Sequence, residues 1–242
     1  DYSTIPLHTI DSDLSFSPKR WSVHYCIFLS FIVEWKKLSA SLPVYSGSNY
    51  IRWGRKSCPP TSKLIYHGEM AGPDYNSAGG GTNYQCLPSD PEYDPKAPAN
   101  QLYSFLRGVR YELYAANTNL FPSKLQGHRA PCAVCKTEKR VNQIMIPAKT
   151  RCPTDDWTLD YKGFLMSSAE TNGDGSLISH HHRGMYVCMD AQAESVTGKV
   201  MANYRGERLY PVAARCTGGG ALTNCPPYLT NRRALSCVVC SK

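Results

Sequence analysis

The chain has 242 residues, with 27 Lys and Arg against 19 Asp and Glu, 42% hydrophobic residues and 11 cysteines. A chain of this length can bury a real core, which excludes a mini-protein held together by cysteines alone. Charged residues make up only 19%, which excludes a charge-rich disordered chain. The net charge of +8 is modest and no basic patch stands out, so we expect no nucleic-acid partner.

Residues 1–43 are expected to lie outside the folded domain. The most apolar run, Trp21–Trp35, is shorter than the roughly 20 residues that a membrane-spanning helix needs. Lys19 and Arg20 precede it, as basic residues precede the apolar core of a secretory signal, whereas Glu34 is unusual at the end of such a signal. The segment is therefore either a signal-like leader or a piece unrelated to the domain, and no stable membrane span is expected.

From Tyr50 onward the cysteines occur twice in the same order: a Cys-Pro, a lone cysteine after an aromatic residue, and a Cys-x-x-Cys. The first set is Cys58, Cys86, Cys132 and Cys135, and the second set is Cys152, Cys188, Cys237 and Cys240. Four matched positions in one order indicate an internal repeat. We predict two homologous subdomains, 44–147 and 148–242.

Between these cysteines, apolar and polar residues alternate with a period of two, as in half-buried strands. The clearest runs are Leu64–Tyr66, Gly108–Tyr114 and Leu209–Ala213. Turn-forming residues gather at Gly79–Gly81, Pro88–Pro98, Asn172–Ser176 and Gly218–Gly220. No segment has a helical period and a good N-cap. The predicted fold class is all-β and disulfide-rich, with two pseudo-duplicated β subdomains, long loops and little helix.

The two Cys-x-x-Cys motifs allow three kinds of chemistry. In a strand, residues three apart point to opposite faces, so the sulfurs of each motif diverge and do not suit one zinc ion. Thiol redox chemistry needs such a motif at the start of a helix, and Cys240 is two residues from the end of the sequence given. Structural disulfides are therefore favoured, with zinc and redox chemistry as the alternatives.

Divergent sulfurs predict two long-range bridges in each half. Cys216 and Cys225 would form an additional local pair in the second half, and Cys26 would be left unpaired within the leader. Which cysteines pair does not follow from the sequence alone.

Several segments resemble the short-chain, spongin-type collagen-related proteins of invertebrates. They are Tyr50–Arg55, Gly79–Leu87, Ala130–Cys135, Ile144–Ala148, Cys152–Pro153 and the tail from Cys225 to Cys240. The match covers residues 44–242. More remotely, the duplicated layout and Gly163–Met166 are similar to the C-terminal non-collagenous domain of type IV collagen.

The resemblance implies two β-rich subdomains, assembly as a trimer and a role in the extracellular matrix. It also implies the pairs Cys58–Cys135, Cys86–Cys132, Cys152–Cys240 and Cys188–Cys237, with Cys216–Cys225 local. The chain departs from these relatives because it has no Gly-X-Y repeat, so this chain alone cannot form a triple helix. The first half also lacks a counterpart of the local pair.

Metal-binding candidates are weak. The cluster His180–His182 could bind a divalent ion, but adjacent histidines cannot easily face one ion, and a solvated loop is favoured. Asp155, Asp156 and Asp160 lack the spacing of a Ca²⁺ loop, and Asn172–Ser176 is better explained as a turn.

Four aromatic residues could either pack in the core or stack on a glycan: Trp53, Tyr66, Tyr75 and Tyr84. Core packing is the favoured reading. No nucleophile motif and no phosphate-binding loop occurs, so no cofactor is expected.

The sequence thus predicts a secreted, non-catalytic structural or assembly domain of the extracellular matrix, with other matrix chains or further copies of itself as partners. The alternative is a lectin-like module that binds glycans through the loops at Gly79–Gly81 and Asn172–Ser176. A third hypothesis is an enzyme or metalloprotein that uses His180–His182.

Overall fold

The computed structural model describes residues 47–75, 82–97, 104–168, 184–196, 200, 205–218, 221–229 and 233–242. All of them belong to one compact unit, Tyr45–Lys242. The predicted leader, 1–43, lies outside the described residues, as does Cys26. Among the described residues, no helix has the length and apolar character needed to cross a membrane.

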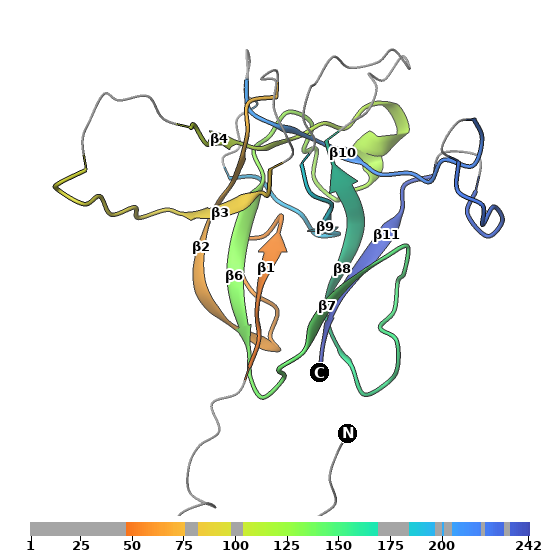
Figure 1. Ribbon diagram of the computed structural model, residues 1–242, viewed down its shortest axis with the longest axis horizontal. Helices are drawn as coiled ribbons and strands as arrows, with labels where there is room; N and C mark the ends of the chain where they lie inside the picture. Colours follow the sequence, from red (N-terminus) through yellow and green to blue (C-terminus); the bar gives the residue numbers. More distant parts are fainter. Residues whose placement is uncertain are drawn as a thin grey trace, which may run out of the picture. The chain divides into compact units, whose positions relative to one another are not determined.

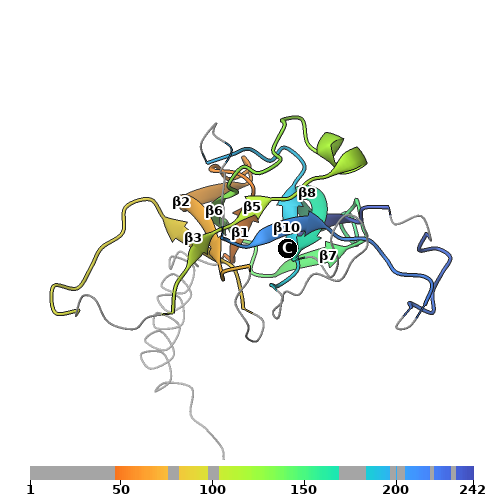
Figure 2. The ribbon, with the colours of Figure 1, turned by 90° about the horizontal axis from the view of Figure 1, so that it is seen from above.

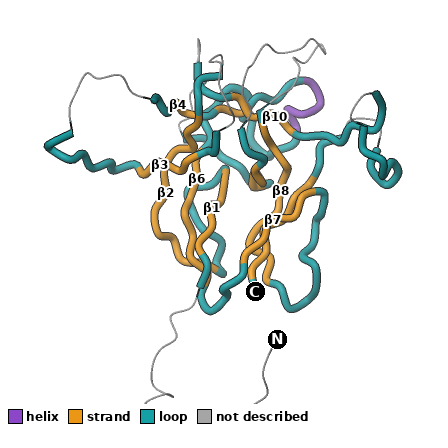
Figure 3. The backbone as a smooth tube through the Cα atoms, viewed as in Figure 1, coloured by secondary structure: helices purple, strands orange, loops and turns teal. Residues whose placement is uncertain are grey.

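The regular secondary structure of the described chain is almost entirely β, with long loops between the strands (Figures 1 and 3), which confirms the predicted fold class. The strands are β1 (Asn49–Trp53), β2 (Ser62–Gly72), β3 (Gln85–Pro88), β4 (Arg107–Gly108), β5 (Arg110–Tyr111), β6 (Pro131–Thr137), β7 (Gln143–Pro147), β8 (Thr158–Ser167), β9 (Val187–Asp190), β10 (Arg208–Pro211) and β11 (Ser236–Ser241). The described helix is a short 3-10 turn, Ala115–Asn119.

The strands form one mixed sheet in the order β3-β2-β6-β1-β9-β8-β10-β5, with β4, β7 and β11 branching from it. In the first half, β6 lies between β1 and β2 and is antiparallel to both. Strand β2 continues past β6 to pair with β3 and β4. Strand β6 contains the first Cys-x-x-Cys motif. Both cysteines of this motif therefore lie on the central strand of the first half.

The second half has the same pairing pattern. Strand β11 lies between β7 and β8, and β8 continues to pair with β9 and β10. The first strands also match in position, since Asn49 precedes Cys58 by nine residues and Gln143 precedes Cys152 by nine. The duplication itself stays a prediction. The sheet groups β7 with the second half, whereas the sequence placed residues through 147 in the first.

Two glycines hold equivalent places in this pattern. A Cβ added to Gly68 would lie 1.5 Å from the carbonyl oxygen of Leu87, and one added to Gly163 would lie 1.7 Å from that of Met189. At both sites, the backbone of the short strand, β3 or β9, lies very close to the glycine of its long partner, β2 or β8. Only glycine allows this approach.

The halves meet where β1 and β9 run parallel, with Trp53 paired to Met189. Seen from above, β2 and β6 lie on one side of the unit and β7 and β8 on the other, with β10 between them (Figure 2). One core cluster contains residues of both halves, among them Met70, Tyr111 and Met189. The two predicted subdomains therefore share a core and one sheet.

One predicted strand, Gly108–Tyr114, is interrupted. Only β4 and β5 are formed there, and the alternation of burial stops at Glu112, which is 1% exposed. Its carboxylate accepts hydrogen bonds from Arg110 Nε at 2.8 Å and from Gln126 Nε2 at 2.8 Å. A buried, ion-paired carboxylate therefore occupies a position that the period-two pattern assigned to the solvent.

Candidate functional site

Ten of the 11 cysteines form five disulfides. They are Cys58–Cys135, Cys86–Cys132, Cys152–Cys240, Cys188–Cys237 and Cys216–Cys225, which are the pairs that the family resemblance implies. Disulfides in this number are typical of proteins that fold in an oxidising compartment, and they indicate an extracellular protein.

The sulfurs of the first Cys-x-x-Cys motif diverge. Cys132 belongs to the core cluster that contains Cys86, whereas Cys135 belongs to a second cluster that contains Tyr161 and Cys188. The motif therefore joins β6 to two different cores. Because all four Cys-x-x-Cys cysteines are in disulfides, no thiolate remains at these positions for zinc or for redox chemistry.

The junction of the halves is closed by a charged pair. On β1, Arg52 donates a hydrogen bond from Nε to Oδ2 of Asp190 on β9, at 2.7 Å. The Nη2 atom of Arg52 also lies 2.7 Å from the same oxygen. The third Arg52 nitrogen, Nη1, donates to the carbonyl oxygen of Ser57 at 2.9 Å. Asp190 is 3% exposed, so this ion pair is nearly dry. It fixes β1 against β9 beside the single residue pair that joins them.

The backbone around Gly54 is held to the second half in the same region. Glu194 accepts from the Lys56 amide at 2.8 Å, and its own amide donates to the Gly54 carbonyl at 2.9 Å. The Tyr111 hydroxyl donates to the Glu194 carbonyl at 2.9 Å. These bonds tie the backbone of both halves together beside the Trp53–Met189 pair.

Strand β7 presents an open edge. Asn142 and Lys242 exchange two backbone hydrogen bonds of 2.9 and 3.0 Å, and the Ala148 amide donates to Ser236 at 2.8 Å. Along an antiparallel pair, alternate residues face the partner strand, so the amides of Gln143 and Met145 face away from β11. Among the described residues, β7 pairs with β11 alone.

The other candidate edge is β3, which stands at the end of the strand order and pairs with β2 alone among the described strands. Its residue Leu87 is 38% exposed. On β7, Ile144 is 42% exposed. Both edges therefore carry apolar side chains in water, and each pairs with a strand on one side alone in the described part of the chain, which is the property of strands that accept another strand.

These edges correspond to the strands that meet at the internal junction. Trp53 precedes Cys58 by five residues and Pro147 precedes Cys152 by five, while Met189 follows Cys188 directly, as Leu87 follows Cys86. By position, Pro147 is therefore the counterpart of Trp53, and Leu87 is the counterpart of Met189. Trp53 and Met189 are paired, whereas Pro147 and Leu87 are not paired with each other within the described chain.

The other sequence-predicted residues are not brought together. Asp156 pairs with Lys242, Asp155 is exposed, and Asp160 is buried. Within the described ranges, no group of three or more His, Cys, Asp or Glu is placed to hold a metal ion. His180–His182 and the loops at Gly79–Gly81 and Asn172–Ser176 lie outside the described residues.

The four aromatic candidates divide. Trp53 and Tyr84 are 5% and 3% exposed and belong to the core, as predicted. Tyr66 is 37% exposed and donates to the Cys86 carbonyl at 3.1 Å. Tyr75 is half-buried beneath Arg208, whose guanidinium lies 4.0 Å from the ring centroid. Tyr66 therefore departs from the favoured core position, and glycan binding stays a prediction.

A second link between the halves involves Asp160, whose side chain is fully buried. Arg140 donates from Nη2 to the Thr61 carbonyl at 2.6 Å and lies 3.5 Å from the Asp160 carboxylate, and its Nε donates to Ser241 at 2.7 Å. Burial raises the pKa of the Asp160 carboxyl, and bonds from Ser241 and Arg140 oppose this rise.

Sequence reasoning missed Arg52, Asp190 and Arg140 as joining residues. Each is an ordinary charged residue in a strand or turn, and its partner is at least 20 positions away in the chain. No local pattern marks such a pair.

No protein-family model matches the chain, and no curated protein is significantly similar to it.

Proposed function

We propose that this protein is a secreted, non-catalytic structural domain of the extracellular matrix that assembles with further copies of itself. The observation that carries the proposal is that β7 and β3, the counterparts of the paired strands β1 and β9, each have an edge without a partner strand in the described part of the chain. Strand β7 of one copy would pair in parallel with β3 of the next, as β1 pairs with β9 within the chain.

The side chains support this pairing. At the internal junction, Arg52 and Asp190 form the ion pair. Their counterparts by position are Ile146 and Pro88, so apolar groups replace both charges. An intermolecular contact built in this way would bury the exposed Leu87 and Ile144 without desolvating a charge.

Each copy would contribute one β7 edge and one β3 edge. Such a contact is heterologous, and repeated contacts close into a ring when the rotation allows it. A trimer is the closed form that the family resemblance implies. The extracellular matrix and other matrix chains as partners also follow from that resemblance, and the disulfide framework supports an extracellular site.

The test is the assembly state of the secreted full chain, measured by light scattering coupled to size exclusion. We expect an oligomer, and we expect Leu87→Glu and Gln143→Pro to abolish it, because the first charges the β3 edge and the second removes an outward amide of β7. Ile65→Glu is the matched control, since Ile65 is 50% exposed but lies on neither edge.

Mixing the two disrupted variants makes the test sharper. The intact β7 of Leu87→Glu can still meet the intact β3 of Gln143→Pro, so the mixture should form a dimer that neither variant forms alone. A wild-type protein that stays monomeric at high concentration would refute the proposal, as would a Leu87→Glu variant that assembles normally.

A further inference from the structure

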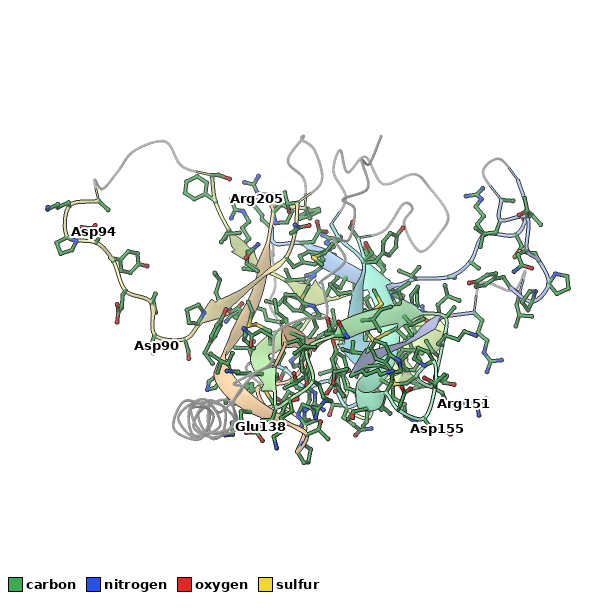
Figure 4. The ribbon with its side chains drawn as sticks, turned by 60° about the horizontal axis from the view of Figure 1, so that its bottom comes forward. Asp90, Asp94, Glu138, Arg151, Asp155 and Arg205 are labelled. Atoms are coloured by element: carbon green, nitrogen blue, oxygen red, sulfur yellow. A yellow bond between two sulfur atoms is a disulfide. The ribbon has the colours of Figure 1, made fainter. Side chains whose placement is uncertain are left out.

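The segment that follows β3 holds a tyrosine in solvent. Every residue from Leu87 to Ala97 is exposed. Tyr93 is 84% exposed, more than any other large hydrophobic side chain in the described part of the chain. Figure 4 shows Asp90 and Asp94, on either side of Tyr93, on a stretch that leads away from the sheet. The phenol is therefore accessible to an enzyme without any unfolding.

Carboxylate residues flank Tyr93 in the chain. Asp90, Glu92 and Asp94 stand three residues before, one before and one after Tyr93, and all three are exposed. The segment carries a single cation, Lys96. In a chain with a net charge of +8, this is a local concentration of negative charge around one nucleophilic hydroxyl.

The backbone keeps the segment out of the sheet. The Lys96 amide donates to Oδ1 of Asp94 at 2.8 Å, and the Ala97 amide donates to the Asp94 carbonyl at 2.9 Å, so a turn follows Tyr93 directly. Pro91 and Pro95 lack an amide hydrogen and cannot continue a strand ladder. An exposed segment that lies outside the sheet can enter an enzyme cleft.

We propose that Tyr93 is a site of tyrosine O-sulfation in the secretory pathway. The enzyme that performs this reaction must bind an anionic sulfuryl donor, so its site is basic and favours tyrosines with neighbouring carboxylates. The five disulfides indicate that the chain passes through the oxidising secretory compartments where the reaction takes place.

The step is a group transfer without any change of oxidation state. The phenolic oxygen of Tyr93 attacks the sulfur of a nucleotide phosphosulfate. The new oxygen–sulfur bond forms while the bond from sulfur to the bridging phosphate oxygen breaks. The nucleotide phosphate leaves with the electron pair, and the phenolic proton passes to a base of the transferase. A neutral hydroxyl becomes a sulfate ester with a permanent negative charge.

The chain contains a matched control in Tyr186. It is 53% exposed, but its neighbours are Met185 and Val187, and no carboxylate lies within three residues of it. Accessibility without neighbouring carboxylates should leave it unmodified.

The test is to secrete the full chain from eukaryotic cells supplied with radioactive sulfate and to search its alkaline hydrolysate for labelled tyrosine sulfate, which separates this ester from sulfated glycans. We expect the label in the wild type and in Tyr186→Phe. We expect its loss in Tyr93→Phe, and also in a variant that keeps Tyr93 but carries Asp90→Asn, Glu92→Gln and Asp94→Asn.

Label that persists in Tyr93→Phe would overturn the proposal. A wild-type chain without labelled tyrosine sulfate, from cells that sulfate a co-expressed reference protein, would also overturn it. Phosphate in place of sulfate on Tyr93 would do the same. The measurement is independent of the assembly state, so its result and that of the assembly test can be told apart.

Discussion

Arg52 and Asp190 form an ion pair across the junction of the two halves, with the nitrogen and oxygen atoms 2.7 Å apart and the aspartate side chain 4% exposed. Their strands share only one paired residue each, Trp53 and Met189. A largely buried charged pair therefore reinforces the strand pairing that has the fewest paired residues in the sheet.

Removing one member of this pair should destabilise the fold. We expect Asp190→Ala to lower the free energy of unfolding by about 3–5 kcal/mol, because it leaves the Arg52 guanidinium buried without a counter-charge. Urea unfolding followed by tryptophan fluorescence, to which the buried Trp53 beside the junction contributes, measures the change. Lys63→Ala is the control and should have no measurable effect, since its pair with Glu138 is exposed. An unchanged midpoint for Asp190→Ala would contradict the role of the pair.

The two close-approach glycines should tolerate no side chain. We expect Gly68→Ala and Gly163→Ala each to cost about 1–3 kcal/mol or more, because the new Cβ must push away the backbone of β3 or β9. Thermal unfolding of the two variants tests this, with Lys162→Ala as a control at an exposed position beside Gly163. If Gly163→Ala melted at the wild-type temperature, the short approach to Met189 would not exist in solution.

The long-range bridges should stabilise the fold more than the local one. Cys188–Cys237 closes a separation of 49 residues and Cys216–Cys225 one of 9. From the entropy of the unfolded chain alone, replacing both members of a pair by alanine should cost about 4 kcal/mol for the first and about 2.5 kcal/mol for the second. Urea unfolding of the two double variants provides the comparison, and equal or reversed losses would show that the unfolded-state entropy does not dominate.

The buried carboxyl of Asp160 should give the protein a stability term that grows in acid. Burial raises its pKa, so the folded state takes up a proton at higher pH than the unfolded state does. Stability from this group then increases as the pH falls through the folded pKa, down to about 4, where the unfolded carboxyl also becomes protonated. Asp160→Asn should remove this increase.

The measurement is urea unfolding of both proteins at a series of pH values from neutral to acid. The difference in stability between wild type and Asp160→Asn should shift in favour of the wild type as the pH falls. A difference that stays constant over the whole range would contradict the raised pKa.

Most of the fold was predictable because its signals are local or repeated. The three-residue spacing of each Cys-x-x-Cys motif placed its sulfurs on two faces of one strand, and the period-two runs indicated β2 and β10. The period-two pattern predicted the burial of Glu112 wrongly. Its carboxylate is buried because Arg110 and Gln126 donate hydrogen bonds to it, and an alternation of apolar and polar residues does not predict such bonds. The open edges at β3 and β7 were also beyond the sequence, since a strand is an edge only by virtue of which strands fail to reach it.

The bridge Cys86–Cys132 has a consequence for proteolysis. The exposed segment Pro88–Ala97 lies between these two cysteines in the chain, and Cys58–Cys135 encloses the same stretch. A protease that cuts this segment would therefore separate the polypeptide without separating the protein, because two covalent links still join the pieces. Under non-reducing conditions, the nicked protein would differ in mass from the intact protein by one added water only. It would release fragments only after reduction.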